Sequence, residues 1–293
     1  MRVFLTGATG FIGGAIVPEL IAAGHQVLGL TRSDAGAQAL IAAGAEPHRG
    51  ELEDLDSLRS GAAQSDGVIH CAFIHDFSKF VENAEIDERA IGALGAALAG
   101  TDRPLIVSGG IGPWGQGGPV SEDDDHPSEA GTPRVSEPAA LAMLSQGVSA
   151  AVVRLPQVHD TTKFGLVSPL IEMAREKGVS AYIDGGQGRW PAAHVRDVAR
   201  LYRLALEQHK AGGVYHAVGE AGVSLKAIAE AIGRGLKLPV VAIPPEEAGA
   251  QFGFFGMFAS LDLTASSDLT QQRLGWRPTG PGMIADLDGK DWS

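Results

Sequence analysis

The chain has 293 residues, 44% hydrophobic and 20% charged, so it can bury a core as one large domain or two smaller ones. Its 35 acidic residues outnumber 23 basic ones, and the formal charge of -12 argues against a nucleic-acid partner. One cysteine cannot form an internal disulfide, no apolar run reaches the roughly 20 residues of a membrane helix, and a strand is predicted where a signal peptide would lie. We therefore expect a cytoplasmic protein with no nucleic-acid or membrane partner.

A glycine-rich turn opens the chain. Residues 3–13 read VFLTGATGFIG, an apolar run followed by Gly7, Gly10 and Gly13 and by a stretch that can form a helix. At a strand-to-helix turn Gly7 permits a tight bend, Gly10 lets the backbone approach a diphosphate, and Gly13 lets the helix pack on its strand. Three glycines are weak evidence in a chain that has 40. The β-type run at 27–30, one helix later, is the context that favours a dinucleotide site.

The first half alternates apolar strands with helical stretches, which predicts a parallel sheet covered by helices. We expect an α/β protein with a Rossmann-type, doubly wound parallel sheet and a smaller C-terminal substrate domain. The predicted strands are 2–6, 27–31, 68–72, 104–108 and 150–155. The predicted helices are 11–23, 34–43, 54–62, 80–99 and 135–146, with a kink or displaced start expected at Pro18 and Pro138.

The pattern changes in two places. The stretch 109–133 has no apolar periodicity and contains an acidic run, as either a binding lid or a solvated loop would. After the last strand above, prolines and glycines interrupt shorter elements. We expect a dinucleotide-binding Rossmann domain at 1–155 and a mainly substrate-binding domain at 156–293, of which about 192–218 returns to the Rossmann core.

Six segments carry a family resemblance. They are TGATGFIG at the first turn, GELEDLDSL at 50–58, VIHCA at 68–72, PLIVSGG at 104–110, AHVRDVA at 193–199 and RLGWRP near the end. In this order and spacing they resemble the extended short-chain dehydrogenase/reductases, the NAD-dependent epimerase/dehydratase type, over nearly the whole chain. The resemblance implies a Rossmann domain that binds NAD(P), a smaller C-terminal substrate domain, and a cleft between them.

The end of the second strand bears on the choice of dinucleotide. A carboxylate there accepts a hydrogen bond from the ribose 2′-OH of NAD, whereas a cation accommodates the 2′-phosphate of NADP. Arg32 offers a planar fork of donors that suits phosphate, and Ser33 adds a hydroxyl. Asp34 is the competing choice if the strand ends two or three residues later. We favour NADP over NAD, with a solvated surface charge as the alternative role of Arg32.

The resemblance, carried onto the first turn and the predicted strand ends, implies a set of cofactor contacts. These are Gly7, Thr9, Gly10, Phe11, Ile12, Gly13, Arg32, Ser33, Glu51, Leu52, Ala72, Phe73, His75, Ser108, Leu155, Pro156 and Val158.

The chain departs from the family at its catalytic residues. The family usually carries Tyr-x-x-x-Lys, in which the lysine lowers the phenol pKa so that the tyrosine exchanges a proton with the substrate oxygen. The tyrosines here are Tyr182, Tyr202 and Tyr215, and the residues four positions later are Gly186, Leu206 and Gly219. Aligning Ser136-Glu137 with the family's Ser-Lys places Pro133 at the tyrosine position. Gly110 falls at the position of the catalytic serine. The combination resembles the atypical members of the superfamily.

Substitute proton donors are sought where strands end. His75 follows the strand at 68–72, next to Asp76, and histidine has a suitable unperturbed pKa. His159 follows the strand at 150–155 and is a comparable candidate. Glu137 is the third candidate, although glutamate and serine near a helix start also suit capping. A phosphate contact or solvent exposure is the competing role of His75.

Four further residues are candidates for the substrate pocket. Gly110 and Trp114 lie in the segment after the strand at 104–108, Arg134 begins the helix where the catalytic pair is lost, and Trp190 offers an apolar wall or a hinge anchor. No spacing of His, Cys, Asp or Glu resembles a metal site.

Two functions remain open at this point. The first is an NADP-dependent oxidoreductase of a small carbonyl or alcohol with a non-standard proton donor, for which a homodimer is one assembly to consider. The second is a non-catalytic NADP-binding protein that signals redox state to a protein partner. The missing tyrosine and lysine favour the second, and the C-terminal domain, which could enclose a substrate, favours the first.

Overall fold

The structure, a computed structural model, describes residues 1–115, 118–126, 134–185 and 188–293. Gly186 and Pro133, which the resemblance places at the family's tyrosine position, lie outside the described residues, as do 116–117 and all of 127–133 within the expected loop.

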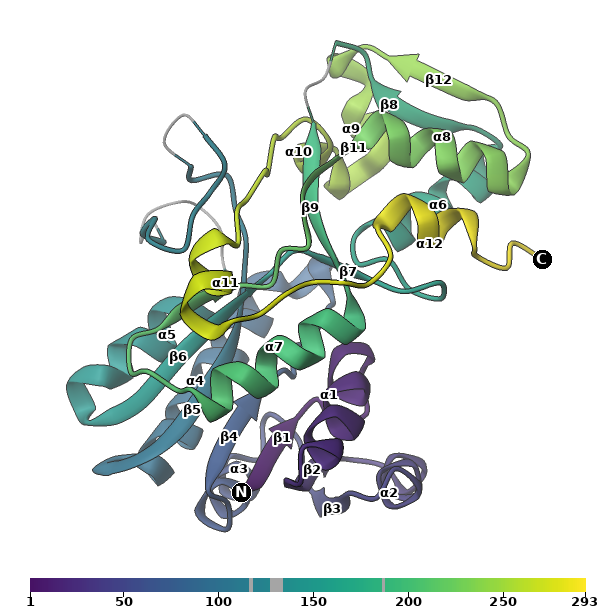
Figure 1. The fold of residues 1–293 in the computed structure, drawn as a ribbon. Coiled ribbons are helices and arrows are strands. Elements are labelled where there is room, and N and C mark those ends of the chain that lie inside the picture. The colour runs from purple at the N-terminus through teal and green to yellow at the C-terminus, as the bar shows by residue number, and fades with distance from the viewer. Residues whose placement is uncertain (116–117, 127–133, 186–187) are drawn as a thin grey trace.

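Strands and helices alternate through the first half (Figure 1). The strands are β1 (Arg2–Thr6), β2 (Gln26–Thr31), β3 (Glu46–Arg49), β4 (Gly67–His70), β5 (Thr101–Gly110) and β6 (Val148–Leu155). The α-helices between them are α1 (Phe11–Ala22), α2 (Asp34–Ala42), α3 (Leu55–Ala63), α4 (Phe80–Leu98) and α5 (Ser136–Ala142).

Within the described ranges, seven strands form one parallel sheet in the order β10-β6-β5-β4-β1-β2-β3, where β10 is Val214–His216. This confirms the predicted Rossmann-type, doubly wound fold. The strand order reverses between β1 and β4, and ligands of such sheets bind beside the carboxyl ends of the strands at this point. We call this side of the sheet the carboxyl edge.

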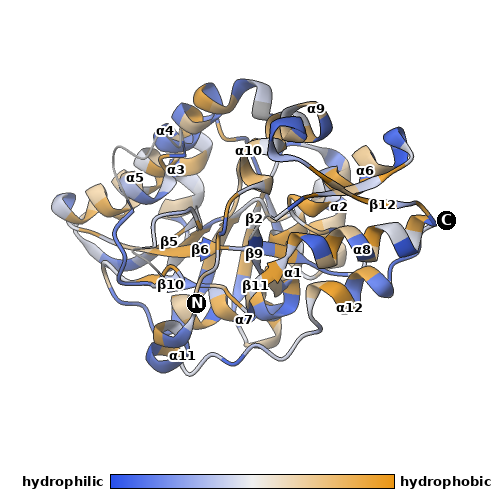
Figure 2. Ribbon diagram, turned by 90° about the horizontal axis from the view of Figure 1, so that it is seen from above, coloured by the Kyte–Doolittle hydropathy of each residue, from blue (hydrophilic) through white to orange (hydrophobic). Residues whose placement is uncertain are grey.

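Two apolar layers hold helices against the sheet. On one face α1 and α7 (Val195–Glu207) contribute Ile16, Leu20 and Tyr202 to a core with β1. On the other face α3, α4 and α5 pack against Phe4 and Leu105 of the strands. Figure 2 shows these strands as an apolar centre, with the hydrophilic residues on the outer helices.

The second half builds a separate apolar core around a short sheet. Its elements are β7 (Gln157–His159), α6 (Val167–Lys177), β8 (Ser180–Ile183), β9 (Arg189–His194), β11 (Glu220–Ser224), α8 (Leu225–Leu236), β12 (Val240–Ile243), α9 (Ala248–Phe252), α10 (Gly256–Ala259) and α12 (Met283–Asp288). α11 (Asp268–Leu274), from the same half of the chain, instead lies against β10 of the Rossmann sheet. In the described residues β11, β9 and β7 form a three-stranded sheet, and β12 pairs with β8.

The chain returns to the Rossmann layer twice. β10 adds to the sheet beside β6, and α7 covers β1 and β4–β6. Leu274 and the wholly buried Trp276 then enter the same core, where the Trp276 indole N–H donates to the Asp197 carbonyl at 2.9 Å. The second return, around 268–276, is not among the sequence expectations.

Two elements differ from the predicted ones. β3 has the sequence EPHR, which carries no apolar alternation. Among the described strands it pairs with β2 alone, at the edge of the sheet, where a proline and polar residues are tolerated. The helix predicted at 135–146 divides into α5 and a 3₁₀ helix at Met143–Gln146. α1, in contrast, runs through Pro18 without a break.

Candidate functional site

The glycine turn leaves space for a ligand at the start of α1. Gly7 has φ +69°, and a Cβ there would lie 2.8 Å from the backbone nitrogen of Ala72. A Cβ on Gly13 would lie 2.1 Å from the Gly7 carbonyl oxygen, so only glycine lets α1 pack this closely. Gly10 is exposed, and among the described residues no side chain caps the helix that follows it. The free N–H groups and the positive end of the helix dipole therefore fit a diphosphate.

The end of β2 presents a cation. Arg32 is exposed and makes no ion pair with the described residues. Asp34, the competing carboxylate, is paired with Arg49 of β3. The Ser33 hydroxyl caps α2 by accepting from the Gly36 N–H at 3.0 Å. Asp34 thus forms a surface ion pair and Arg32 forms none with the described residues, and the preference for NADP stays a prediction.

The other predicted cofactor contacts lie at the carboxyl edge. Glu51 and Leu52 follow β3, Ala72, Phe73 and His75 follow β4, Ser108 lies near the end of β5, and Leu155, Pro156 and Val158 lie at the end of β6 and in β7. The structure brings the predicted positions to one side of the sheet, but it contains no nucleotide, so their contacts with cofactor stay predictions.

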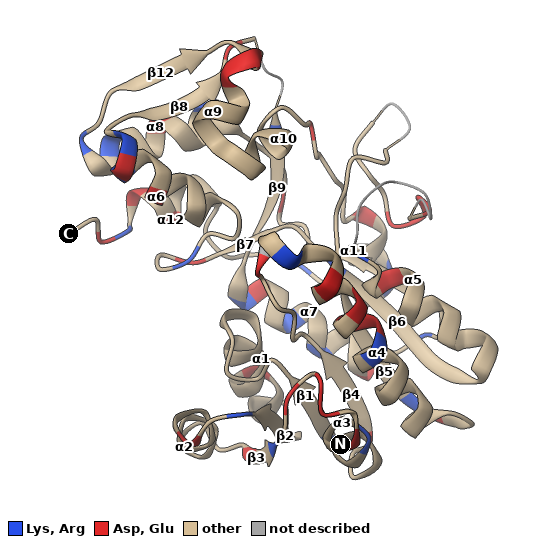
Figure 3. Ribbon diagram, turned by 180° about the vertical axis from the view of Figure 1, so that it is seen from behind, with Lys and Arg blue, Asp and Glu red and all other residues tan. Residues whose placement is uncertain are grey.

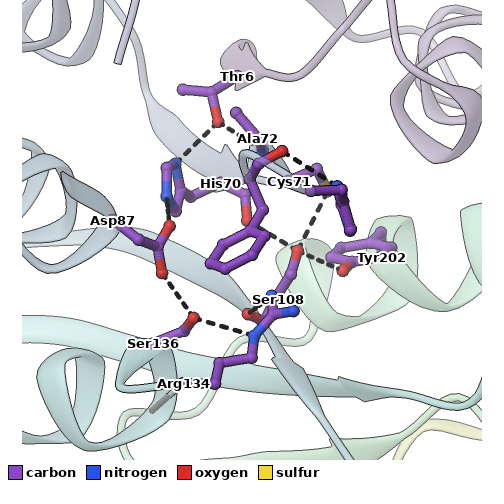
Figure 4. Close-up of polar contacts among 11 residues, drawn as sticks. Thr6, His70, Cys71, Ala72, Asp87, Ser108, Arg134, Ser136 and Tyr202 are labelled. Carbon is purple, nitrogen blue, oxygen red and sulfur yellow. Dashed lines mark hydrogen bonds and ion pairs between the residues drawn. The ribbon is translucent and has the colours of Figure 1, made fainter. Parts of the chain in front are cut away.

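A buried hydrogen-bonded chain crosses this edge (Figure 4). Thr6, one residue before Gly7, contacts Nδ1 of His70 at 2.8 Å and accepts from the Ala72 N–H at 3.2 Å. His70 Nε2 lies 2.9 Å from one oxygen of Asp87, and the Ser136 hydroxyl donates to the other oxygen at 2.5 Å. Burial alone raises the pKa of Asp87, but the hydrogen bonds from His70 and Ser136 bring it below its usual value. Asp87 is therefore a carboxylate.

Asp87 is a residue that the sequence analysis missed. The outer face of α4 carries the exposed Glu82, Glu85 and Glu88, and Figure 3 shows acidic residues along this helix. Asp87 instead lies on the buried face, among Ala84 and the other apolar residues of the helix. A lone carboxylate at an otherwise apolar helix position is the signal that could have identified it.

Arg134 lies at the other end of the hydrogen-bonded chain that begins at Thr6. Its Nε donates to the Ser136 hydroxyl at 3.2 Å, and one terminal nitrogen donates to the Ser108 carbonyl at 3.2 Å. The guanidinium carbon lies 4.4 Å from the centre of the Phe73 ring. A Cβ on Gly110, at the family's serine position, would lie 3.9 Å from Cδ of Arg134. The half-buried arginine therefore lies beside the position that the glycine leaves bare.

His75 lies close to this cation. It is exposed, and its Nδ1 contacts the Phe73 carbonyl at 3.1 Å, which makes Nδ1 the protonated nitrogen and Nε2 the basic one. Desolvation and then the charge of Arg134 lower the pKa of His75. A neutral imidazole suits a proton acceptor.

The tyrosines lie elsewhere. Tyr182 is in β8 and Tyr215 is in β10, while Tyr202 is wholly buried in α7. The Tyr202 hydroxyl lies 2.6 Å from that of Ser108, and burial raises the Tyr202 pKa well above its usual value. Tyr202 thus contacts β5 through Ser108 and stays protonated.

Glu137 is held in a buried ion pair. Nε and one terminal nitrogen of Arg154 donate to its two oxygens, at 2.8 and 2.6 Å, and both side chains are buried. α5 has no side-chain cap among the described residues, so neither Glu137 nor Ser136 serves as one. The structure thus corrects both sequence-based roles, because Glu137 is buried and fastens α5 to β6 through its ion pair with Arg154.

His159 is also enclosed. It is 0% exposed, and its Nδ1 contacts Asp286 of α12 at 2.7 Å, while Nε2 has no hydrogen-bond partner among the described residues. Burial lowers its pKa despite that carboxylate. This placement contradicts a direct contact between His159 and substrate, because the ring joins β7 to α12 inside the protein.

The tryptophans have different surroundings. Trp190 is 0% exposed in the core of the second half, and its indole N–H donates to the Phe258 carbonyl at 3.1 Å, so the predicted pocket wall is wrong. Trp114 is half-buried, with its ring centre 5.6 Å from the Arg154 guanidinium carbon. Its role in a substrate pocket stays a prediction.

The described residues lack two kinds of feature. No group of three or more His, Cys, Asp or Glu in that part of the chain could hold a metal ion. None of its helices is long and apolar enough to span a membrane.

The fold and the glycine turn define an NAD(P)-binding Rossmann protein. A family model described as NAD dependent epimerase/dehydratase family matches residues 3–96. A protein of Schizosaccharomyces pombe, described as uncharacterized, is 48% identical over 289 residues, which are 98% of each chain. The chain therefore belongs to the NAD-dependent epimerase/dehydratase family of the short-chain dehydrogenase/reductases, which confirms the resemblance.

Two other similar proteins have more specific descriptions. The 4-hydroxy-2-methyl-3-oxo-4-farnesyl-3,4-dihydroquinoline-1-oxide ketoreductase of Stigmatella aurantiaca is 28% identical over 264 residues, 85% of this chain and 78% of that protein. The structure of a UDP-glucose-4-epimerase from Stenotrophomonas maltophila with bound NAD and formylated UDP-arabinopyranose has a TM-score of 0.76 at 19% identity, covering 100% of this chain and 97% of the other. The second likeness shows the fold alone.

Proposed function

We propose that the chain is an NADP-dependent oxidoreductase that interconverts a small carbonyl compound and its alcohol without the Tyr-x-x-x-Lys pair. The observation that carries the proposal is the hydrogen-bonded chain from Thr6 to Arg134, which joins the glycine turn to a half-buried cation at the same edge of the sheet. The ketoreductase activity named for the Stigmatella relative supports this class of reaction.

Different residues of the protein bind different parts of the cofactor. The N–H groups of α1 bind the diphosphate, and Arg32 binds the 2′-phosphate that distinguishes NADP from NAD. The nicotinamide, when bound, supplies or accepts the hydride. The protein then has to hold the substrate oxygen and move one proton.

His75 is our candidate for that proton. Its Nε2 is the basic nitrogen, and the lowered pKa keeps the ring neutral near pH 7. In alcohol oxidation Nε2 would take the hydroxyl proton, and in carbonyl reduction the protonated ring would return it. Neither Glu137 nor His159 is available for this task, since both are enclosed.

A redox-sensing protein without turnover is the second candidate, because no tyrosine in the sequence has a lysine four positions later. Binding and turnover measured on one preparation separate the two. We expect NADPH to bind more tightly than NADH, and at least one member of a panel of ketones and aldehydes to be reduced. Tight binding of NADPH with no product from any member of the panel would favour the sensor, and absence of binding would contradict both.

A further inference from the structure

Arg134 is a cation with little direct compensation. Among the described residues it makes two hydrogen bonds, to a hydroxyl and to a carbonyl, and no ion pair shorter than 4 Å. The nearest counter-charge that the hydrogen bonds reach is Asp87, one step away through Ser136. Half-buried charges are stable when they are paired. This guanidinium can therefore accept an anionic partner.

The position of the guanidinium is fixed on three sides. Ser136 holds Nε, the Ser108 carbonyl holds one terminal nitrogen, and the Phe73 ring covers a face at 4.4 Å. The other terminal nitrogen makes no hydrogen bond with the described residues. Side chains held in this way act as preorganised donors, because they need no rearrangement when charge develops.

Gly110, beside this guanidinium, has no side chain. Among the described atoms, the nearest to a Cβ built there is Cδ of Arg134, 3.9 Å away. The family resemblance of the sequence implies a serine at this position. The arginine thus stands where a hydroxyl donor is missing.

We infer that Arg134 forms an oxyanion subsite, in which the terminal nitrogen that bonds to no described residue binds the substrate oxygen that carries full or developing negative charge. This inference rests on the proposed function for its substrate and names the group that replaces the missing tyrosine and serine. Ser136 and Asp87 are positioning residues in this account, because they act through Arg134.

The chemistry balances with a nicotinamide donor. In reduction, hydride from NADPH forms a C–H bond at the carbonyl carbon, the C=O π bond breaks, and its electron pair stays on oxygen. Arg134 stabilises that alkoxide and keeps its own proton. The oxygen then takes a proton from His75 or from water, and the products are the alcohol and NADP⁺.

A carboxylate is a stable probe of such a subsite, so we would titrate benzoate into the protein saturated with NADP⁺ and follow the heat of binding. We expect Arg134→Ala and Arg134→Gln to weaken benzoate about 10- to 100-fold, as loss of a charged hydrogen bond does. Arg134→Lys should retain part of the affinity. Arg175→Ala is the matched control, because Arg175 is exposed in α6 and pairs only with Glu172 among the described residues. NADP⁺ affinity should not change in any of these variants.

Equal benzoate affinity in the wild type, Arg134→Ala and Arg134→Gln overturns the inference, and so does a wild type that does not bind benzoate. A subsite that depends on Arg134 in a protein that reduces no carbonyl overturns the proposed oxidoreductase and leaves the subsite standing. Where turnover is found, kcat/KM should fall about 10²- to 10³-fold in Arg134→Ala, and added guanidinium should restore part of it. A merely structural role would give no such rescue.

Discussion

Gly10 and Gly14 lie four residues apart at the start of α1 and differ in what surrounds them. A Cβ on Gly10 would lie 3.1 Å from the Gly7 carbonyl oxygen, a contact that requires this backbone to shift by a few tenths of an ångström. A Cβ on Gly14 would meet no described atom within 4 Å. The two positions therefore separate an effect on the ligand from an effect on the helix.

We predict that Gly10→Ala folds but binds NADPH at least about tenfold more weakly, because the methyl group occupies the space of the diphosphate. Gly14→Ala should bind as the wild type does. Fluorescence titration with NADPH measures both, and circular dichroism checks the fold. Normal affinity in a folded Gly10→Ala protein would mean that the turn does not bind the diphosphate.

A second prediction at the residue scale concerns Arg32. Replacing it with alanine should weaken NADPH about 10- to 100-fold and leave NADH nearly unchanged, since only NADPH carries the 2′-phosphate. Titration of both nucleotides into wild type and variant gives the comparison. Equal losses for the two would show that Arg32 does not contact the phosphate.

At the scale of elements, α5 depends on charge for its attachment to the sheet. The Glu137–Arg154 pair is buried, so removing one partner leaves an uncompensated charge, which typically costs about 3–5 kcal/mol. We predict such a loss of unfolding free energy for Glu137→Gln in urea denaturation. Glu172→Gln, from an exposed pair with Arg175 in α6, should change stability by less than about 1 kcal/mol. A stable Glu137→Gln protein would reopen a catalytic role for Glu137.

The elements also show which parts of the fold could be predicted from the sequence. Strands that follow apolar runs, such as β1 and β2, and the glycine turn between β1 and α1 were predictable, because local periodicity and turn chemistry specify them. β3 was not, because an edge strand needs no apolar face. The hydrogen-bond partners of Glu137 and Asp87 are 17 or more residues away in the sequence, and no local pattern encodes such contacts.

At the scale of the whole molecule, buried histidines make stability depend on pH. His216 of β10 is wholly buried, its Nδ1 contacts the Ser266 carbonyl at 2.7 Å, and its Nε2 faces an N–H of Arg154 at 3.1 Å. Burial, with the charge of Arg154 against it, lowers the pKa of His216 from 6.5 to about 4, although Glu137 and Asp124 oppose the shift. Protonation of His216 would place its positive charge directly against that of Arg154.

The unfolded state therefore binds a proton between pH 6.5 and 4 that the folded state does not, so the unfolding free energy should fall as pH is lowered through this range. The full difference corresponds to about 3 kcal/mol. Urea denaturation at several pH values should show this slope in the wild type and a smaller one in His216→Gln. Identical slopes would show that His216 does not contribute.

The central claim is that hydride transfer survives the loss of the tyrosine and lysine. The most direct measurement uses NADPH carrying deuterium at the transferable position of the nicotinamide, a panel of ketones and aldehydes, and mass spectrometry of the products. We predict one deuterium on the carbinol carbon of at least one alcohol product of the wild type. The Gly10→Ala variant should give none when the NADPH concentration is well below the Kd of the variant for NADPH. Tight NADPH binding by the wild type with no deuterium in any product would contradict the claim.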